Sequence, residues 1–279
     1  MELDAVPDLD EPVLVAAFEG WNDAGEAATA VIEHLEEAWQ AVQLGSMDPE
    51  EYYDFQVNRP HVSVDETGVR NLDWPTTRLS LARPPAVARD VVLVRGIEPN
   101  IRWRAYCSEL LAAAGDLGVQ QLVTLGALLA DVPHTRPVPV TVSTNDGALA
   151  KSMGWEPSRY QGPTGIVGVL QDAATHRGLR ATTLWAAVPH YVAQSPCPKA
   201  TLVLLRRIED LLNLPVPLGD LPGEARAWQH GVEELATEDP EIADYVRRLE
   251  QARDTTDLPE ASGEHIAREF ERYLRRRDQ

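Results

Sequence analysis

The sequence predicts an α/β fold in which helices cover both faces of a mostly parallel sheet. Short apolar runs without polar alternation recur along the chain, as is typical of strands buried on both faces. Longer segments whose apolar residues have helical spacing follow these runs, and glycine or proline separates the two kinds of segment. Strands that alternate with helices form crossover units, so we expect parallel strands covered by helices.

The first strand and the first helix are expected near the start of the chain. Residues 13–18 are wholly apolar and predict the strand. Apolar residues at helical spacing then predict a helix that begins at Asn22 or Asp23 as its N-cap and ends at Gly45. Two further segments indicate shorter strands that would extend the sheet at one edge, residues 52–64 and 76–81.

The same alternation returns three times after residue 89. The apolar runs predict strands at residues 90–95, 119–125 and 181–188. The segments of helical spacing predict helices at residues 101–117, 164–176 and 198–213.

The chain changes character after Pro222, where charged helical segments replace the alternation. Residues 224–253 and 260–277 are expected to be helical, with a break at Asp239-Pro240 that allows a third helical piece. We therefore expect a core domain over residues 1–218 and a helical extension over residues 219–279. The apolar stripe of the extension is interpreted as packing back on the core, and the alternative is a module that binds a partner protein.

Composition and charge bound the function. The chain has 279 residues, of which 44% are hydrophobic and 25% charged, as expected of a protein with a packed core. The net charge of −19 argues against nucleic acid or an anionic membrane as a partner. Across residues 1–60 the only Lys or Arg is Arg59, and we interpret this acidity as a solvated surface.

Cysteine usage and the chain ends point to a cytoplasmic protein without a bound metal. Cys107 and Cys197 have no Cys or His neighbour at metal-ligand spacing, so no metal site is expected, and no motif indicates a cofactor. No signal peptide and no apolar run long enough to span a bilayer is present, which predicts a cytoplasmic location.

Four polar loops follow predicted strands, and ligands of parallel α/β sheets gather at the carboxyl ends of their strands. Their acidic groups and histidines would form an acid/base set of Glu19, Asp23, Glu98, His134 and His190. The same loops supply candidate ligand-binding or interface residues, namely Trp21, Asn22, Arg95, Asn100, Gly126 and Arg136. A further loop before a predicted helix offers backbone amides to an anion, at Gly162, Thr164 and Gly165.

Each of these residues also has a structural interpretation. Asp23 would cap the first helix, and Glu19 would pair with Arg95 or Arg102 at the end of a strand. His134 and His190 would be ordinary loop residues. No complete catalytic motif is present. We therefore treat these residues as candidates, assign a catalytic role to none of them, and expect a protein that is not an enzyme.

Six segments of the sequence resemble one protein family. Phe-Glu-Gly-Trp-Asn-Asp-Ala-Gly occupies residues 18–25, and Arg-Gly-Ile-Glu-Pro-Asn occupies residues 95–100. Arg102-Trp103 comes next, and three further segments follow in the same order, at residues 124–137, 160–166 and 184–191. Together they cover most of residues 13–213, and the chain is identified as a member of the proteasome assembly chaperone 2 family in its actinobacterial form.

The resemblance implies a three-layer α/β/α fold similar to purine nucleoside phosphorylases and hydrolases, and association into homo-oligomers. Among closed rings we expect a trimer. Relatives help to assemble the proteasome core particle, some through a C-terminal hydrophobic-Tyr-X tail. This chain ends Arg-Arg-Arg-Asp-Gln and lacks that tail, with Tyr273 five residues before Asp278.

We therefore expect a non-enzymatic, chaperone-like protein in complex assembly, with itself and proteasome subunits as partners. The alternative is an enzyme or binding protein for a nucleoside-like or anionic ligand at the strand-end loops, which the polar loops and the phosphorylase-like layout motivate.

Overall fold

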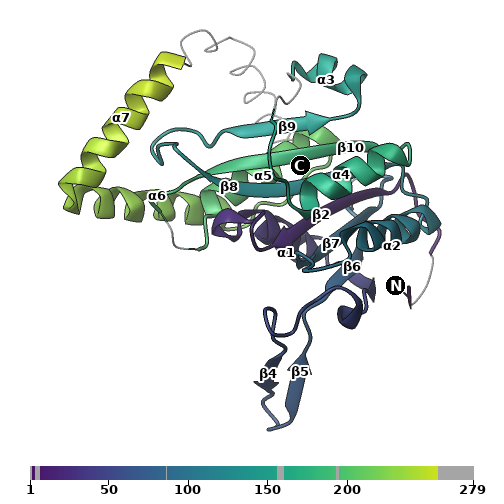
Figure 1. Ribbon diagram of the computed structural model, residues 1–279. Coiled ribbons are helices and arrows are strands. Elements are labelled where there is room, and N and C mark those ends of the chain that lie inside the picture. Colours follow the sequence, from purple (N-terminus) through teal and green to yellow (C-terminus); the bar gives the residue numbers. More distant parts are fainter. Residues whose placement is uncertain (1, 4–6, 86, 156–159, 193–194, 257–279) are drawn as a thin grey trace.

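The centre of the molecule is an eight-stranded sheet with the strand order β1-β3-β6-β7-β2-β8-β10-β9 (Figure 1). The computed structural model describes residues 2–3, 7–85, 87–155, 160–192 and 195–256. The four middle strands run parallel to one another: β7 (Val91–Ile97), β2 (Val13–Glu19), β8 (Gln121–Ala130) and β10 (Arg180–Pro189). The outer strands pair antiparallel: β1 (Glu2–Leu3), β3 (Val42–Ser46), β6 (Thr77–Ala82) and β9 (Val140–Thr144).

The prediction of a mostly parallel sheet was wrong, because only three of the seven strand pairings are parallel. The sheet is mixed. The parallel centre comes from crossover connections that contain helices, as predicted. Strand β6 pairs antiparallel with both β3 and β7, and β9 pairs antiparallel with β10 at the edge of the sheet.

Strand β2 shows why the sheet needs helices on both faces. Its side chains alternate between two apolar clusters, with Val13, Val15 and Ala17 in one cluster. Leu14, Ala16 and Phe18 lie in the other. Each face of the strand therefore has to be covered by apolar side chains from another layer.

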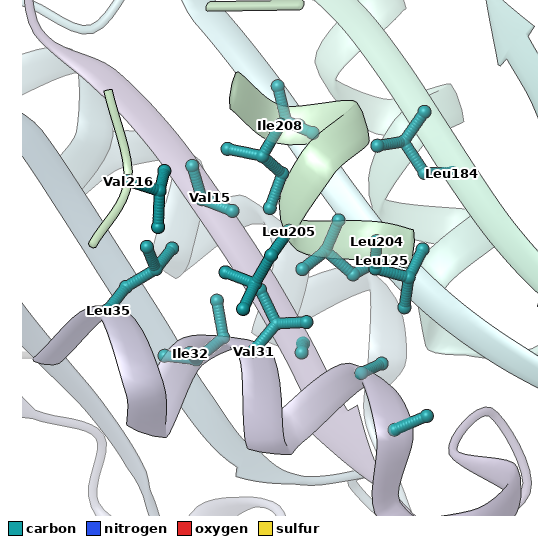
Figure 2. Packing of buried hydrophobic residues seen from close by; sticks show 14 of the residues in the cluster. Val15, Val31, Ile32, Leu35, Leu125, Leu184, Leu204, Leu205, Ile208 and Val216 are labelled. Carbon is teal, nitrogen blue, oxygen red and sulfur yellow. The ribbon is translucent and has the colours of Figure 1, made fainter. Parts of the chain in front are cut away.

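One face is covered by α1 (Ala27–Ala38) and α5 (Pro198–Leu212). Figure 2 shows Val31 and Ile32 of α1 meeting Leu205 and Ile208 of α5 over Val15 of the sheet. The other face is covered by α2 (Trp103–Asp116) and α4 (Ile166–His176), with the fully buried Tyr106 at its centre. The predicted helices over both faces are therefore present.

Several element boundaries differ from the prediction. Helix α1 ends at Ala38 and not at Gly45, because Gln40 takes a left-handed backbone conformation with φ 50° and turns the chain into β3. Gly45 instead lies in β3, where the register against β6 shifts. Residues 52–60 contain no strand, and β9 and α3 (Gly147–Met153) were not predicted. The prolines before β9 hide its apolar alternation.

A β-hairpin projects away from the layered body (Figure 1). It consists of β4 (His61–Val64) and β5 (Arg70–Asp73), which form a sheet of their own. All eight residues of the two strands are exposed. We call residues 57–74 the arm.

Two further helices follow α5, namely α6 (Leu221–Glu238) and α7 (Pro240–Thr256). The predicted break at Asp239-Pro240 separates them, and Leu221 and Ala225 of α6 join the core cluster against α5. The domain boundary at residue 218 stays a prediction, and the predicted helix at residues 260–277 lies outside the described residues. Within the described residues, no helix combines the length and apolar character that a membrane crossing requires.

Candidate functional site

The four predicted loops lie at one edge of the sheet, because the strands that they follow are parallel neighbours. Backbone hydrogen bonds join them in sequence across the edge. The Glu98 amide donates to the Glu19 carbonyl at 3.0 Å, and the Ala127 amide donates to the Asn22 carbonyl at 2.7 Å. The His190 amide donates to the Ala130 carbonyl at 3.2 Å. The loops form one continuous rim.

The Glu98 side chain joins three elements at this rim. Its Oε1 atom accepts from Asn22 Nδ2 at 2.7 Å and from the Ile166 amide at 2.8 Å. Ile166 is the first residue of α4, so the carboxylate occupies the helix N-terminus that an anion would otherwise bind. Asn22 is fully buried, and its Oδ1 atom lies where a side chain at Gly165 would begin, 2.0 Å from the position of an added Cβ.

Glycine is therefore required at Gly165 to let the loops close, and the same applies at Gly126. An added Cβ at Gly126 would lie 2.5 Å from the ring of Trp185 on β10. Gly162 packs under Tyr160, whose hydroxyl donates to the Pro163 carbonyl. Thr164 sits against Gly168 in the first turn of α4. The predicted anion loop is held together by its own contacts.

Asp23 caps α1 from several residues upstream. Gly25 and Glu26 both have a left-handed backbone, which turns the chain so that the Asp23 carboxylate reaches the exposed end of the helix. Its Oδ1 atom accepts from the Ala28 amide at 2.6 Å, and its Oδ2 atom accepts from the Thr29 hydroxyl. Burial raises the pKa of Asp23, and these hydrogen bonds oppose the shift. The contacts of Asp23 are therefore those of a residue that caps a helix.

Arg95 and Arg102 pair with carboxylates other than Glu19. Arg95 lies 3.4 Å from Glu33 and 3.5 Å from Glu36, and Arg102 pairs with Glu51. Desolvation raises the pKa of Glu19, and the charge of Arg95 opposes this shift. The Glu19 carboxylate thus stands without an ion pair among the described residues and faces a cleft.

That cleft lies between the arm and the ends of β2 and β7 and has a volume of about 330 Å³. The charged and aromatic residues of its wall are Glu19, Arg59, His61, Asp73, Trp74, Arg78 and Arg95. Asn100 stands beside it and fixes the base of the arm, because its Oδ1 atom accepts from the Asp54 amide at 2.8 Å and from Asn58 Nδ2 at 2.9 Å. We call this space the arm cleft. Trp21 is elsewhere on the rim and is 66% exposed.

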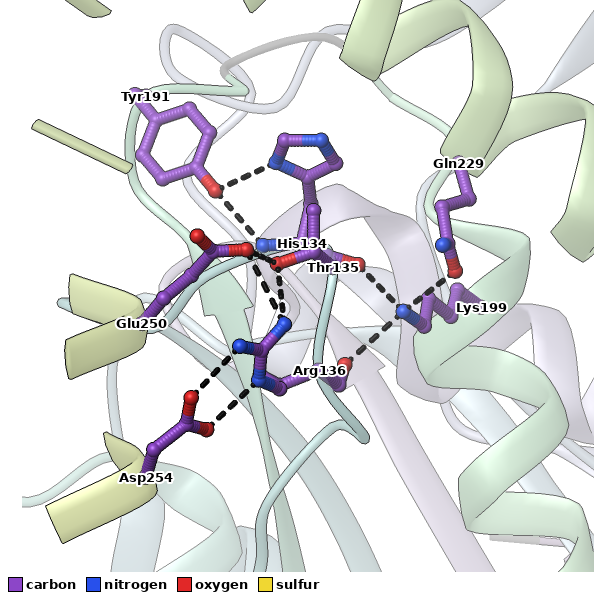
Figure 3. Close-up of polar contacts among 8 residues, drawn as sticks. All are labelled: His134, Thr135, Arg136, Tyr191, Lys199, Gln229, Glu250 and Asp254. Atoms are coloured by element: carbon purple, nitrogen blue, oxygen red, sulfur yellow. Dashed lines mark hydrogen bonds and ion pairs between the residues drawn. The ribbon is translucent and has the colours of Figure 1, made fainter. Parts of the chain in front are cut away.

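His134 belongs to a separate buried cluster at the ends of β8 and β10 (Figure 3). Its backbone amide donates to the Tyr191 hydroxyl at 2.7 Å, and its Nδ1 atom lies 2.8 Å from the same hydroxyl oxygen. Its Nε2 atom is buried and meets no partner within the described part of the chain. Burial lowers the pKa of His134, with the Lys199 charge, while Glu233 and Glu250 oppose the shift.

Lys199 holds the loop that carries His134. Its ammonium group donates to the carbonyls of His134 and Arg136, and to Gln229 Oε1 of α6 at 2.7 Å. Lys199 is the second residue of α5, so this one side chain joins the β8 loop to two helices (Figure 3).

Arg136 ties the same loop to α7. It binds Asp254 through two hydrogen bonds of 2.8 and 2.7 Å and reaches Glu250 Oε1 at 3.1 Å. His190 contributes to the same attachment, because its Nδ1 atom lies 3.1 Å from Asp131, which also accepts from Tyr245 of α7 at 3.0 Å. Arg136, Glu250 and Asp254 thus hold α7 against the loop after β8.

The structure therefore does not bring the five acid/base candidates into one set. Glu98 and Asp23 hold helix ends, Glu19 faces the arm cleft, and His134 and His190 hold the loops under α7. The described residues contain no cluster of three or more side chains able to hold a metal ion.

Sequence reasoning missed the residues that come from distant segments. Lys199 was visible as one of only two lysines in the chain, but its partners on α6 were not. Arg59 was noted as the only Lys or Arg in the first sixty residues, yet its place beside Arg78 and Arg95 depends on how the arm folds back.

Comparison with known proteins finds one family model and several solved structures. The model of the PAC2 family matches residues 17–236. A PAC2 family protein from Streptomyces avermitilis is 60% identical with a TM-score of 0.80, over 84% of this chain and 99% of that chain. A Mycobacterium tuberculosis protein described as a proteasome-assembly chaperone homologue is 54% identical with a TM-score of 0.78, over the same shares.

An archaeal proteasome activator from Pyrococcus furiosus shares the fold at 15% identity, with a TM-score of 0.67 over 84% of this chain and 97% of that chain. No curated protein matches the sequence.

Replacing Asp23 by alanine is expected to lower the free energy of unfolding by about 1–2 kcal/mol, because the first amides of α1 lose their acceptor. Asp23→Asn keeps an oxygen acceptor and should cost less. Urea denaturation of both variants measures the difference. Equal losses for the two substitutions would show that the carboxylate does not act as a cap.

The His134 cluster predicts a specific pH dependence of stability. The folded pKa of His134 lies below its ordinary value of 6.5, so below that pH the unfolded chain takes up a proton that the folded chain resists. The stability contributed by neutral His134 is present above pH 6.5 and is lost as the pH falls towards the folded pKa. Urea denaturation between pH 7.5 and pH 5 should show this loss in the wild type and a smaller loss in His134→Gln.

His230→Gln is the matched control for this measurement, because His230 is an exposed histidine on α6. It should keep the wild-type pH dependence. A His134→Gln variant whose stability falls with pH as steeply as that of the wild type would contradict the assignment.

Proposed function

The chain belongs to the PAC2 family, and from this premise we propose that it is a chaperone-like, homo-oligomeric protein that helps to assemble a protein complex. Its homologue from M. tuberculosis is described as a proteasome-assembly chaperone homologue. Proteasome subunits are therefore the partners that we propose for this chain, and we propose no enzymatic activity.

The observation that carries this proposal is the uncovered apolar face of the arm. Val62 pairs with Leu72 across the two strands, and Val64 lies on the same face by the alternation of side chains, opposite Arg70 at the edge of this face. The three apolar side chains are 49%, 50% and 65% exposed. The opposite face is polar, with a hydrogen bond from Ser63 to Asp73 at 3.1 Å.

Such alternation is typical of a sheet that buries one face. A two-stranded hairpin alone in water is marginally stable, and burying each of these side chains would contribute about 1.5–3 kcal/mol. An arm that projects from the body and presents this face supports binding to another protein chain, either a second copy or a subunit of the assembled complex.

The roles of the rim residues support the non-enzymatic part of the proposal. A general acid or base has to reach a substrate proton. Here the Glu98 and Asp23 carboxylates accept from the backbone amides of Ile166 and Ala28, and the Nδ1 atom of His134 lies 2.8 Å from the Tyr191 hydroxyl. These contacts support structural roles for Glu98, Asp23 and His134, whereas Glu19 has no such contact among the described residues and faces the arm cleft.

The double variant Val62→Ser/Leu72→Ser tests the proposal. Light scattering at micromolar concentration should give an oligomer for the wild type and a smaller species for the variant. The reason is that serine side chains at these two positions gain little free energy when the face is buried. Capture from native lysate should recover proteasome core-particle subunits with the wild type and fewer with the variant. Asn71→Ser, on the polar face, is the control and should behave as the wild type.

A wild-type protein that is monomeric and recovers no core-particle subunit would overturn the proposed function. If the variant keeps both the oligomer and the capture of core-particle subunits, the arm is not the surface through which the protein binds.

A second candidate, a binding protein for a nucleoside-like or anionic small molecule, is favoured by the arm cleft. Its volume of about 330 Å³ suits a small ligand, and the Glu19 carboxyl with its raised pKa faces that space. Thermal-shift screening against nucleosides, nucleotides and phosphate tests it. A hundredfold excess over Kd should stabilise the protein by about 2.7 kcal/mol, and Glu19→Ala should change the shift. The absence of any shift would exclude this candidate.

A further inference from the structure

The rim carries a second group of exposed apolar side chains, apart from those of the arm. Trp21 in the loop after β2 is 66% exposed, and Leu128 and Leu129 at the end of β8 are 43% and 56% exposed. The Ala127 amide donates to the Asn22 carbonyl, so Trp21 and Leu128 adjoin the two residues that this hydrogen bond joins. Neighbouring apolar side chains that the fold leaves uncovered indicate a surface that binds another protein. We call Trp21, Leu128 and Leu129 the rim patch.

The arm does not cover the rim patch of its own chain. Strands β7 and β2 lie between β6, which follows the arm, and β8, which carries most of the patch. The arm projects away from the layered body (Figure 1), and the apolar side chains of both surfaces stay exposed within one chain. The arm and the rim patch are therefore two different apolar surfaces. Copies that join through two different surfaces associate head to tail.

Carboxylates border the rim patch. Between residues 19 and 37 the chain has no Lys or Arg and six acidic residues, namely Glu19, Asp23, Glu26, Glu33, Glu36 and Glu37. Glu33 and Glu36 pair with Arg95. Glu26, five residues after Trp21, is exposed, and no ion pair joins it to a cation within the described part of the chain. A cation that a partner brings beside Trp21 is therefore favoured.

The apolar face of the arm carries such a cation. Arg70 pairs with Val64 across the arm, and directly opposed side chains lie on the same face of a sheet. Arg70 is exposed, and among the described residues no ion pair joins it to a carboxylate. The acidic residues of the arm lie elsewhere, with Asp73 on the opposite face and Asp65 and Glu66 in the turn at the tip. An apolar face edged by an arginine thus matches an apolar patch edged by a glutamate.

We infer that the apolar face of the arm of one copy binds the rim patch of a second copy. Leu72 packs against Trp21, a type of side chain that is enriched at the centres of interfaces, and Arg70 pairs with Glu26. Each copy offers one arm and one rim patch, so the contact repeats from copy to copy and closes into a ring. The inference rests on the proposed homo-oligomer and names the surface that receives the arm.

A mixture of two variants tests the inference. The arm variant Val62→Ser/Leu72→Ser lacks the face that binds, and the rim variant Trp21→Ser/Leu128→Ser lacks the patch that receives it. In sedimentation velocity at micromolar concentration, each variant alone should be a monomer where the wild type is a ring. An equal mixture, measured at rising concentration, should give a dimer of one copy of each variant, because the intact arm of one meets the intact rim patch of the other.

Val42→Ser/Leu235→Ser is the matched control. It also replaces two exposed apolar side chains by serine, on β3 and α6, outside both surfaces. It should form the wild-type ring, which separates the loss of these contacts from a general loss of apolar surface. Far-UV circular dichroism of the arm and rim variants should match that of the wild type, because the replaced side chains are exposed.

An exchange of charge tests the pair of Arg70 and Glu26. Arg70→Glu and Glu26→Arg should each raise the concentration at which half of the chains are assembled by about tenfold, since like charges then meet at the contact. The two changes in one chain place opposite charges together again and should restore the wild-type value. A structural effect of either change would persist in this double variant.

Three results would overturn the inference. A rim variant that keeps the wild-type oligomer, while the arm variant loses it, would show that the arm binds elsewhere and would leave the proposed function standing. A mixture of the two variants that stays monomeric at every concentration would indicate a contact between two arms. A charge exchange that leaves association impaired would exclude the pairing of Arg70 with Glu26. A wild-type protein that is monomeric would instead overturn the proposed function itself, and this inference with it.

Discussion

The closure of the rim depends on one carboxylate, that of Glu98. Four parallel strands end at the same edge, and each loop brings backbone polar groups that must be satisfied away from water. Glu98 accepts from the first amide of α4 and also from the side-chain Nδ2 of the buried Asn22, and these two residues leave no room for a side chain at Gly165. The result is a rim held by charge-assisted hydrogen bonds, which are stronger than neutral ones. The α4 terminus, the β2 loop and the β7 loop therefore keep their places together.

The rim and the arm differ in the kind of contact that their side chains make. Polar groups on the rim are directed inward and hold helices: Asp23 holds α1, Lys199 holds the β8 loop on α5 and α6, and Arg136 holds α7. Exposed apolar side chains are concentrated on the arm, outside the layered body, although others, such as Trp21 and Leu129, lie on the body itself. A protein arranged in this way supports binding through a projecting element while its core stays fixed, and this separation connects the fold to the proposed role in assembly.

The sequence was informative where burial is decided locally. The run at residues 13–18 predicted β2 because both faces of that strand are buried, and Asp239-Pro240 predicted the break between α6 and α7. The end of α1 was wrongly placed at Gly45, because the residue with a left-handed backbone after this helix is Gln40 and not a glycine. The site was harder to predict. The loops could be placed at one edge from the topology alone, but the partners of Glu98 and Arg136 lie 68 and 118 residues away along the chain.

The attachment of the arm has a mechanical consequence. Its base is joined to the β7 loop by Asn58 and Asn100, and its second strand leads into Trp74, which packs on Phe55. The arm is thus attached to the body at its base, and its tip projects away from the body. A load placed on the tip acts on the start of α2, because Asn100 lies three residues before Trp103. Thermal motion of the arm and tension from an attached chain would reach the layered body through this joint.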